Sequence, residues 1–152
     1  MRVTAKVDYT VRAAIELADA DRSNPLKGER IAREQGIPMK YLENILGELK
    51  RSGLVGSQRG AEGGYWLARP ADKVTVAELI RAVEGPLANV RGLRPEEVAF
   101  EGKAVPLQRM WVSVRASLRS VLEAVTVADL VSGRLPPDVD ALADDPDAWE
   151  PH

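Results

Sequence analysis

Residues 26–69, LKGERIAREQGIPMKYLENILGELKRSGLVGSQRGAEGGYWLAR, contain the pattern that decides the fold. Apolar residues recur at helical spacing in 29–35 and again in 38–51, and Gly36-Ile37 separates the two segments. Two helices that cross steeply need a turn residue that tolerates a positive φ, which glycine does. A glycine-rich segment follows at 54–69. The pattern predicts a helix-turn-helix followed by a two-stranded hairpin.

The second predicted helix has one apolar side and one polar side. Its apolar residues are spaced 3, 1 and 3 apart, which places them on one buried stripe. Pro38 suits the first position of this helix, where the missing N–H would be unpaired in any case. The stripe consists of Leu42, Ile45, Leu46 and Leu49, and the opposite side carries Lys40, Tyr41, Glu43, Asn44 and Gly47.

The side chains on the polar side have the chemistry that reads base edges. Lys40 suits guanine or a phosphate, Asn44 can bond adenine through two hydrogen bonds, and Glu43 can accept from cytosine N4. Gly47 costs roughly 1 kcal/mol against alanine inside a helix, and close approach of another backbone or a phosphate would justify it. An ordinary amphipathic surface helix has the same pattern, so the helix pair alone leaves both interpretations open.

The predicted hairpin favours nucleic-acid binding. Its tip, Gly60-Ala61-Glu62-Gly63-Gly64, is flexible enough to enter a groove. Arg59 beside the tip can reach the minor groove or a backbone phosphate. A glycine-rich loop can also cradle a nucleotide phosphate, but no Gly-Lys-Ser/Thr or GxGxxG pattern opens a helix after this one. The hairpin is therefore interpreted as a DNA-binding wing.

The flanking segments predict further helices. Residues 8–20 share an apolar face and predict the first helix, and 21–27 form a polar loop. Thr75 and Glu78 form a capping box that opens a short helix, which closes at Gly85-Pro86. These helices complete a small domain around the helix pair.

A heptad seam follows between Pro106 and about Val125. An intramolecular core helix and a dimerisation helix both fit so short a seam, and a helix that does both satisfies each interpretation. Thr126 and Asp129 are expected to cap a short final turn. The seam residues, spaced 4, 3, 4, 3 and 4, are Leu107, Trp111, Val114, Leu118, Val121 and Val125.

Composition indicates a single small protein without thiol chemistry. The 152 residues include no cysteine, so neither disulfides nor thiolate metal sites are available. No signal peptide and no apolar run of about 20 residues is present, which predicts a soluble, cytoplasmic protein.

The net charge of −2 divides into +3 for residues 1–70 and −5 for 71–152. DNA attraction must therefore come from local placement of Lys and Arg. The acidic residues after Arg134 predict a disordered tail.

Several short motifs together resemble the Rrf-two family of bacterial winged-helix regulators, over residues 1 to about 132. The family includes repressors of iron-sulfur biogenesis, nitric-oxide sensing and cysteine metabolism. The motifs are Met1-Arg2-Val3-Thr4-Ala5-Lys6, Tyr41-Leu42-Glu43-Asn44-Ile45-Leu46, Gly53-Leu54-Val55, Arg59-Gly60 with Gly63-Gly64-Tyr65, and Val83-Glu84-Gly85-Pro86.

The resemblance implies a homodimeric repressor that binds a partly palindromic operator. It implies a mostly α fold with a small β-wing. A winged helix-turn-helix domain would span 1–85, a linker or effector-response loop 86–105, a dimerisation helix 106–132 and an acidic tail 133–152. The positions that match the family's DNA contacts are Lys40, Tyr41, Glu43, Asn44, Arg59 and Gly60.

The chain departs from the cluster-binding members of the family. Those members carry three cysteines where this sequence has none, so an iron-sulfur cluster lacks an adequate ligand set and no cofactor or metal is expected. Asp8 matches a carboxylate ligand of some relatives, but alone it cannot hold a cluster. Glu96, Glu97 and Glu101 could bind a hard cation with Asp8, although such charge runs are usually solvated loop.

The cysteine-free character is more similar to the family's cysteine-metabolism repressors. That similarity implies a response to a partner enzyme of cysteine synthesis or to a metabolite, and an unrelated small-molecule effector is an alternative. A second class is a protein-interaction adaptor that has lost DNA binding. An enzyme ranks last, because no nucleophile lies beside a base and the one histidine, His152, is terminal.

Overall fold

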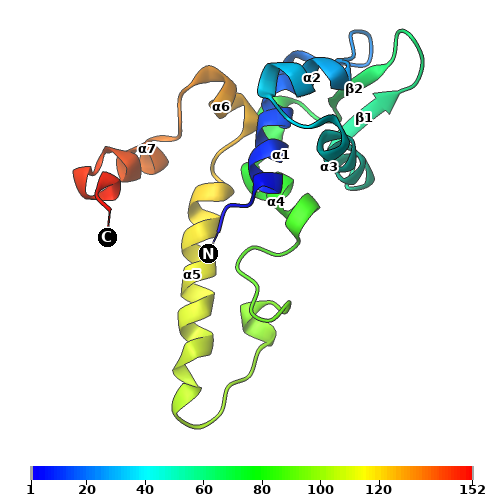
Figure 1. Ribbon diagram of the computed structural model, residues 1–152. Coiled ribbons are helices and arrows are strands. Elements are labelled where there is room, and N and C mark those ends of the chain that lie inside the picture. The colour runs from blue at the N-terminus through cyan, green and yellow to red at the C-terminus, as the bar shows by residue number, and fades with distance from the viewer. Residues whose placement is uncertain (1, 152) are drawn as a thin grey trace.

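The computed structural model describes residues 2–151, which form a mostly helical fold with a small hairpin. Helices α1 to α4 and the hairpin make up one body, and α5 extends away from it (Figure 1). The predicted fold class is confirmed. The helices are α1 (Ala5–Glu16), α2 (Gly28–Gln35), α3 (Met39–Arg51), α4 (Val76–Glu84), α5 (Pro106–Leu122), α6 (Val127–Ser132) and α7 (Pro137–Asp144), and the strands are β1 (Val55–Gln58) and β2 (Gly64–Leu67).

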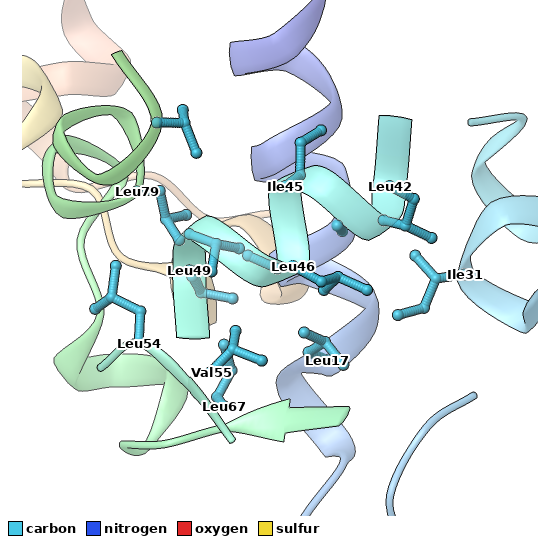
Figure 2. Packing of buried hydrophobic residues seen from close by; sticks show 14 of the residues in the cluster. Leu17, Ile31, Leu42, Ile45, Leu46, Leu49, Leu54, Val55, Leu67 and Leu79 are labelled. Atoms are coloured by element: carbon cyan, nitrogen blue, oxygen red, sulfur yellow. The ribbon is translucent and has the colours of Figure 1, made fainter. Parts of the chain in front are cut away.

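The main hydrophobic core lies under α3. All four predicted stripe residues of this helix are at most 1% exposed. Figure 2 shows them among side chains from α2, the end of α1, the hairpin and α4. Burying one such aliphatic side chain contributes about 1.5–3 kcal/mol, so the stripe fixes which side of α3 faces outward. The neighbours in this cluster include Leu17, Ile31, Leu54, Val55, Leu67 and Leu79.

Turn and cap residues set the helix boundaries. Gly36 ends α2 with φ +62, the left-handed conformation that the sequence predicts for this turn. The capping box of Thr75 and Glu78 is present at the start of α4. The first helix differs from its predicted range of 8–20: α1 begins at Ala5 because the Thr4 side chain accepts from the Val7 N–H, and a short 3₁₀ turn follows its last residue.

The hairpin is tied to the body as well as to itself. Val55 pairs with Leu67 and Gln58 with Gly64 in an antiparallel register. An isolated bridge joins Leu26 to Tyr65. A Cβ on Gly64 would lie 2.6 Å from the Leu26 carbonyl oxygen, so this bridge requires glycine at position 64.

The predicted dimerisation helix 106–132 is two helices in the structure. Helix α5 ends at Leu122, and a capping box of Thr126 and Asp129 starts α6. The assignment of Val125 to the dimer seam is corrected, because Val125 is only 6% exposed and packs inside the chain against Val76 and Val139.

The acidic tail also differs from its prediction. Where disorder is expected, the structure has α7 and a 3₁₀ turn at Pro146–Trp149. Val139 is 8% exposed and packs in a second apolar cluster, so one inward side chain holds α7 against the body. Asp138 and Asp140 lie in its first turn, where carboxylates favour a helix N-terminus.

Candidate DNA-binding face

The polar side of α3 points away from the body. Lys40, Tyr41, Glu43 and Asn44 are all exposed, and Tyr41 is 56% exposed. They occupy the first two turns of α3, where a recognition helix contacts base edges. The expected orientation of these side chains is therefore what the structure has.

A groove separates α3 from the wing, and we name it the α3–wing groove. Its volume is about 400 Å³. Glu43, Gly47 and Lys50 line it from α3, and Arg59 and Gly60 line it from the wing. The structure thus brings three of the predicted site residues, Glu43, Arg59 and Gly60, to one surface.

A second hollow lies on the other side of α3. Tyr41 and Asn44 line it together with Arg51 and Lys6. Lys40 lines neither hollow and lies at the N-terminal end of the helix. The six predicted contact residues therefore lie on the two flanks of α3 and at its N-terminal end, and Glu43 lines both hollows.

Gly47 lines both hollows and lies between them. A Cβ at this position would have as its near neighbour only the Arg51 Nη1, at an ordinary contact distance of 3.5 Å. Packing within the chain therefore does not require glycine here. The opening above Gly47 leaves room for a backbone or phosphate group from outside the chain.

Lys27 forms hydrogen bonds to the wing tip, and the sequence alone did not predict this contact. Its Nζ donates to the carbonyl oxygen of Gly60 at 3.2 Å and also to that of Ala61. Because Lys27 directly precedes α2, the tip is held at a fixed position relative to the helix pair. The sequence gives little indication of this hydrogen bond, since Lys27 is 33 residues from Gly60 and nothing distinguishes it from other exposed lysines.

Tyr41 is positioned by residues of α1. Its ring meets the Tyr9 ring edge-on, with centroids 6.2 Å apart and planes at 82°. The Arg12 guanidinium lies 5.0 Å from the Tyr9 ring centroid and donates to the Gln35 carbonyl oxygen at 2.9 Å. Asp8 lies 3.2 Å from Arg12 Nε. Asp8 therefore pairs with an arginine of its own helix.

The charge on the α3–wing groove is mixed. Lys27, Lys50 and Arg59 contribute three cations, and Glu29 and Glu43 contribute two carboxylates. The groove offers local positive charge for phosphates beside acceptors for base edges.

Helix α5 has an apolar seam that the chain itself does not bury. Leu107 is 39% exposed, and Trp111, Val114, Leu118 and Val121 are half-buried. No residue of the 17-residue helix is fully buried. The five seam residues that remain after the correction at Val125 therefore leave a surface to which a second helix could pack.

Comparisons with known proteins agree on one family. The Rrf2 profile, described as an iron-dependent transcriptional regulator, matches residues 3–133. Rv1287 of Mycobacterium tuberculosis, named as an HTH-type transcriptional regulator, is 44% identical over 150 residues, which cover 99% of this chain and 93% of the relative. The regulator CymR of Bacillus subtilis is 34% identical over 132 residues, which cover 87% of this chain and 91% of the relative.

Solved structures give the same result. The structure of CymR, named as the global cysteine regulator of B. subtilis, aligns with a TM-score of 0.72 at 33% identity and covers 88% of this chain and 98% of that chain. The structure of T. potens IscR aligns with a TM-score of 0.68 at 30% identity, and the alignment covers 100% of this chain and 93% of the IscR chain. These relatives are named as regulators, so the prediction that the chain is not an enzyme is confirmed.

The donor set does not fit the iron that the family description mentions. The sequence has no cysteine. Within residues 2–151, no three His, Cys, Asp or Glu side chains gather as a metal site would require. The alternative of a hard cation on Asp8 with Glu96, Glu97 and Glu101 is therefore wrong, because Asp8 pairs with Arg12 and Glu96 with Arg115.

Among residues 2–151, no helix is both long and apolar enough to cross a bilayer.

Proposed function

Since the chain belongs to the Rrf2 (Rrf-two) family of transcriptional regulators, we propose that it is a homodimeric, sequence-specific repressor that works in the cytoplasm on operator DNA. The observation that carries the proposal is the α3–wing groove. A buried stripe turns the polar side of α3 outward, and Lys27 holds the wing tip beside it. In this arrangement α3 enters the major groove and the wing contacts the adjacent backbone or minor groove.

Two copies of this face are needed to read a partly palindromic operator. The apolar seam of α5 supplies a surface for pairing, and two-fold symmetry then places two copies of α3 on one side of the duplex. The half-sites lie one or two helical turns apart, and one turn is about 34 Å. Dimerisation and DNA recognition thus use separate parts of the chain.

Alanine at Asn44 or Arg59 is expected to weaken operator binding by roughly 10-fold, because a bidentate base contact is worth about 1–3 kcal/mol. Asn44→Ala should also relax base preference at one position, whereas Arg59→Ala should reduce the salt dependence of binding. Electrophoretic shift at fixed salt measures the first effect and a salt titration the second. Arg134→Ala, an exposed arginine after α6, is the matched control and should bind as the parent protein does.

The same titration separates the repressor from an adaptor that has lost DNA binding. A repressor shifts its operator in a sequence-selective and salt-dependent manner. An adaptor would show no selectivity between the operator and a scrambled duplex. Equal affinity of Asn44→Ala, Arg59→Ala and Arg134→Ala would contradict the assigned face.

Control of sulfur metabolism is the regulon that the relatives favour. CymR, 34% identical to this chain, is named as the global cysteine regulator of B. subtilis. This chain has no cysteine with which to hold an iron-sulfur cluster. We expect a cysteine synthase to change the operator shift at least several-fold, and O-acetylserine to alter that effect. If neither addition changes the shift, the sulfur assignment fails and an unrelated small-molecule effector takes its place.

A further inference from the structure

A cavity lined by four arginines lies between the body and α5. Its volume is about 390 Å³, which suits a molecule of metabolite size. Its walls come from the C-terminal part of α4, the segment that follows it, the 3₁₀ turn at Pro95–Glu97 and α5. In Figure 1 this is the region where α5 leaves the body beside the 86–105 segment. The arginines are Arg81, Arg94, Arg115 and Arg119.

Two glutamates neutralise only part of this charge. Glu123 pairs with Arg81 of α4 and, at 2.9 Å, with Arg119 of α5. Glu96, on the cavity wall, pairs with Arg115. Four guanidinium groups outnumber these two carboxylates, and a third carboxylate, that of Glu97, lies beside Arg94, whose backbone N–H donates to Glu97 Oε2 at 3.0 Å. The surroundings of the cavity therefore keep a net positive charge.

The carboxylates in this network stay ionised at neutral pH. Hydrogen bonds from Arg119 and Arg81 lower the pKa of Glu123 to about 2, and a hydrogen bond from Arg115 lowers the pKa of Glu96. The ion pairs of these two glutamates therefore persist at neutral pH.

The guanidinium groups keep free donors. Each guanidinium carries five N–H groups in a planar fork. Each ion pair uses one nitrogen of its arginine, and these nitrogens are Arg81 Nη2, Arg115 Nη1 and Arg119 Nε. Arg94 makes no ion pair within 4.0 Å in the described residues. Guanidinium forks bind carboxylate, sulfate and phosphate through paired hydrogen bonds, so unused donors around a cavity of this size suit an anion.

We infer that this cavity binds a small anion, a metabolite whose negative charge is carried by carboxylate, sulfate or phosphate groups. An anion compensates the net positive charge of the walls, and a neutral or cationic molecule would not. The ligand would sit among the side chains of Arg81, Arg94, Arg115 and Arg119 and displace neither glutamate.

The site connects the two working parts of the chain, a consequence that rests on the proposed function. Arg81 belongs to the DNA-binding body, Arg94 to the 86–105 segment, and Arg115 and Arg119 to the helix that carries the dimer seam. A ligand that bonds to all three parts fixes the angle at which α5 leaves the body. Because two copies of α5 set the separation of the two recognition helices, anion binding shifts operator affinity.

Calorimetry on the full chain without DNA tests the site. Inorganic phosphate, sulfate and succinate are the probes, sodium chloride of matched ionic strength is the reference, and serine is the uncharged control. We expect saturable binding of at least one dianion, and the three probes distinguish oxyanions of phosphorus or sulfur from dicarboxylates. Arg94→Gln and Arg119→Gln should weaken it at least 10-fold, and Arg134→Gln, outside the cavity, should leave it unchanged.

Circular dichroism of each variant confirms that it is folded. No saturable binding of any probe, or equal loss in Arg94→Gln and Arg134→Gln, overturns the inference. Because no DNA is present, this result stands apart from the operator shift. Loss of operator recognition would contradict the proposed function and would not affect the inferred anion site. Absence of anion binding together with a normal operator shift would contradict only the anion site.

Discussion

Aspartate at Val114 is expected to convert the proposed dimer to monomers and to weaken operator binding by at least about 100-fold. Val114 lies in the middle of the apolar seam of α5, between Trp111 and Leu118, and is half-buried within its own chain. In a two-fold interface the new carboxylate appears on both helices, so two charges meet in an apolar contact and each must be desolvated. A monomer loses the second half-site, and the gain from two linked sites is of order 100-fold or more.

Sedimentation velocity measures the first effect and electrophoretic shift the second. Ser113→Asp is the matched control, because Ser113 is the neighbouring residue on α5, is exposed, and lies off the seam. It places the same charge on the same helix and should leave both measurements unchanged. A dimeric Val114→Asp, or a monomeric Ser113→Asp, would show that the chain pairs through another surface.

The orientation of α3 could be predicted because its signal is local. Spacing alone identifies the buried stripe from Leu42 to Leu49, and the order of helix, glycine turn, helix and hairpin follows from neighbouring residues. The glycines of the wing tip have a local cause as well. A Cβ at Gly63 would lie 2.1 Å from the Gln58 carbonyl oxygen, within the same hairpin.

Contacts between distant segments could not be predicted in this way. The Lys27 contact to the wing tip and the ring contact of Tyr9 with Tyr41 depend on how α1, α2 and the hairpin pack. The arginine cavity gathers charged side chains from three segments, α4, residues 86–105 and α5, and each of these side chains resembles ordinary surface charge in the sequence. No local pattern distinguishes such residues from solvated ones.

Val125 shows how a correct pattern leads to a wrong assignment. It continues the heptad spacing of α5, but α5 has already ended at Leu122. The Val125 carbonyl oxygen accepts from the Val76 N–H at 2.9 Å, and Val127 N donates to the Val74 carbonyl oxygen at the same distance. Backbone pairing with the start of α4 therefore overrides the helical period at this position.

Truncation of Leu49 to alanine is expected to lower the free energy of unfolding by about 2–5 kcal/mol, the usual cost of removing a buried leucine side chain and leaving a cavity. Leu49 is fully buried and belongs to the cluster that holds α3 against the wing and α4 (Figure 2). Domains of this kind have total stabilities of about 5–15 kcal/mol, so the loss is a large share. Urea unfolding at one fixed protein concentration measures this loss, since the proposed dimerisation would make stability concentration-dependent.

Leu142→Ala is the control for this measurement, because Leu142 is 58% exposed on α7 and its truncation leaves no cavity. Its unfolding midpoint should stay within about 0.5 kcal/mol of the parent protein. Equal destabilisation by the two substitutions would mean that the stripe on α3 is not the buried side. The exposed position of Asn44 depends on the same rotation of α3, so that outcome would also remove the assigned DNA-reading surface.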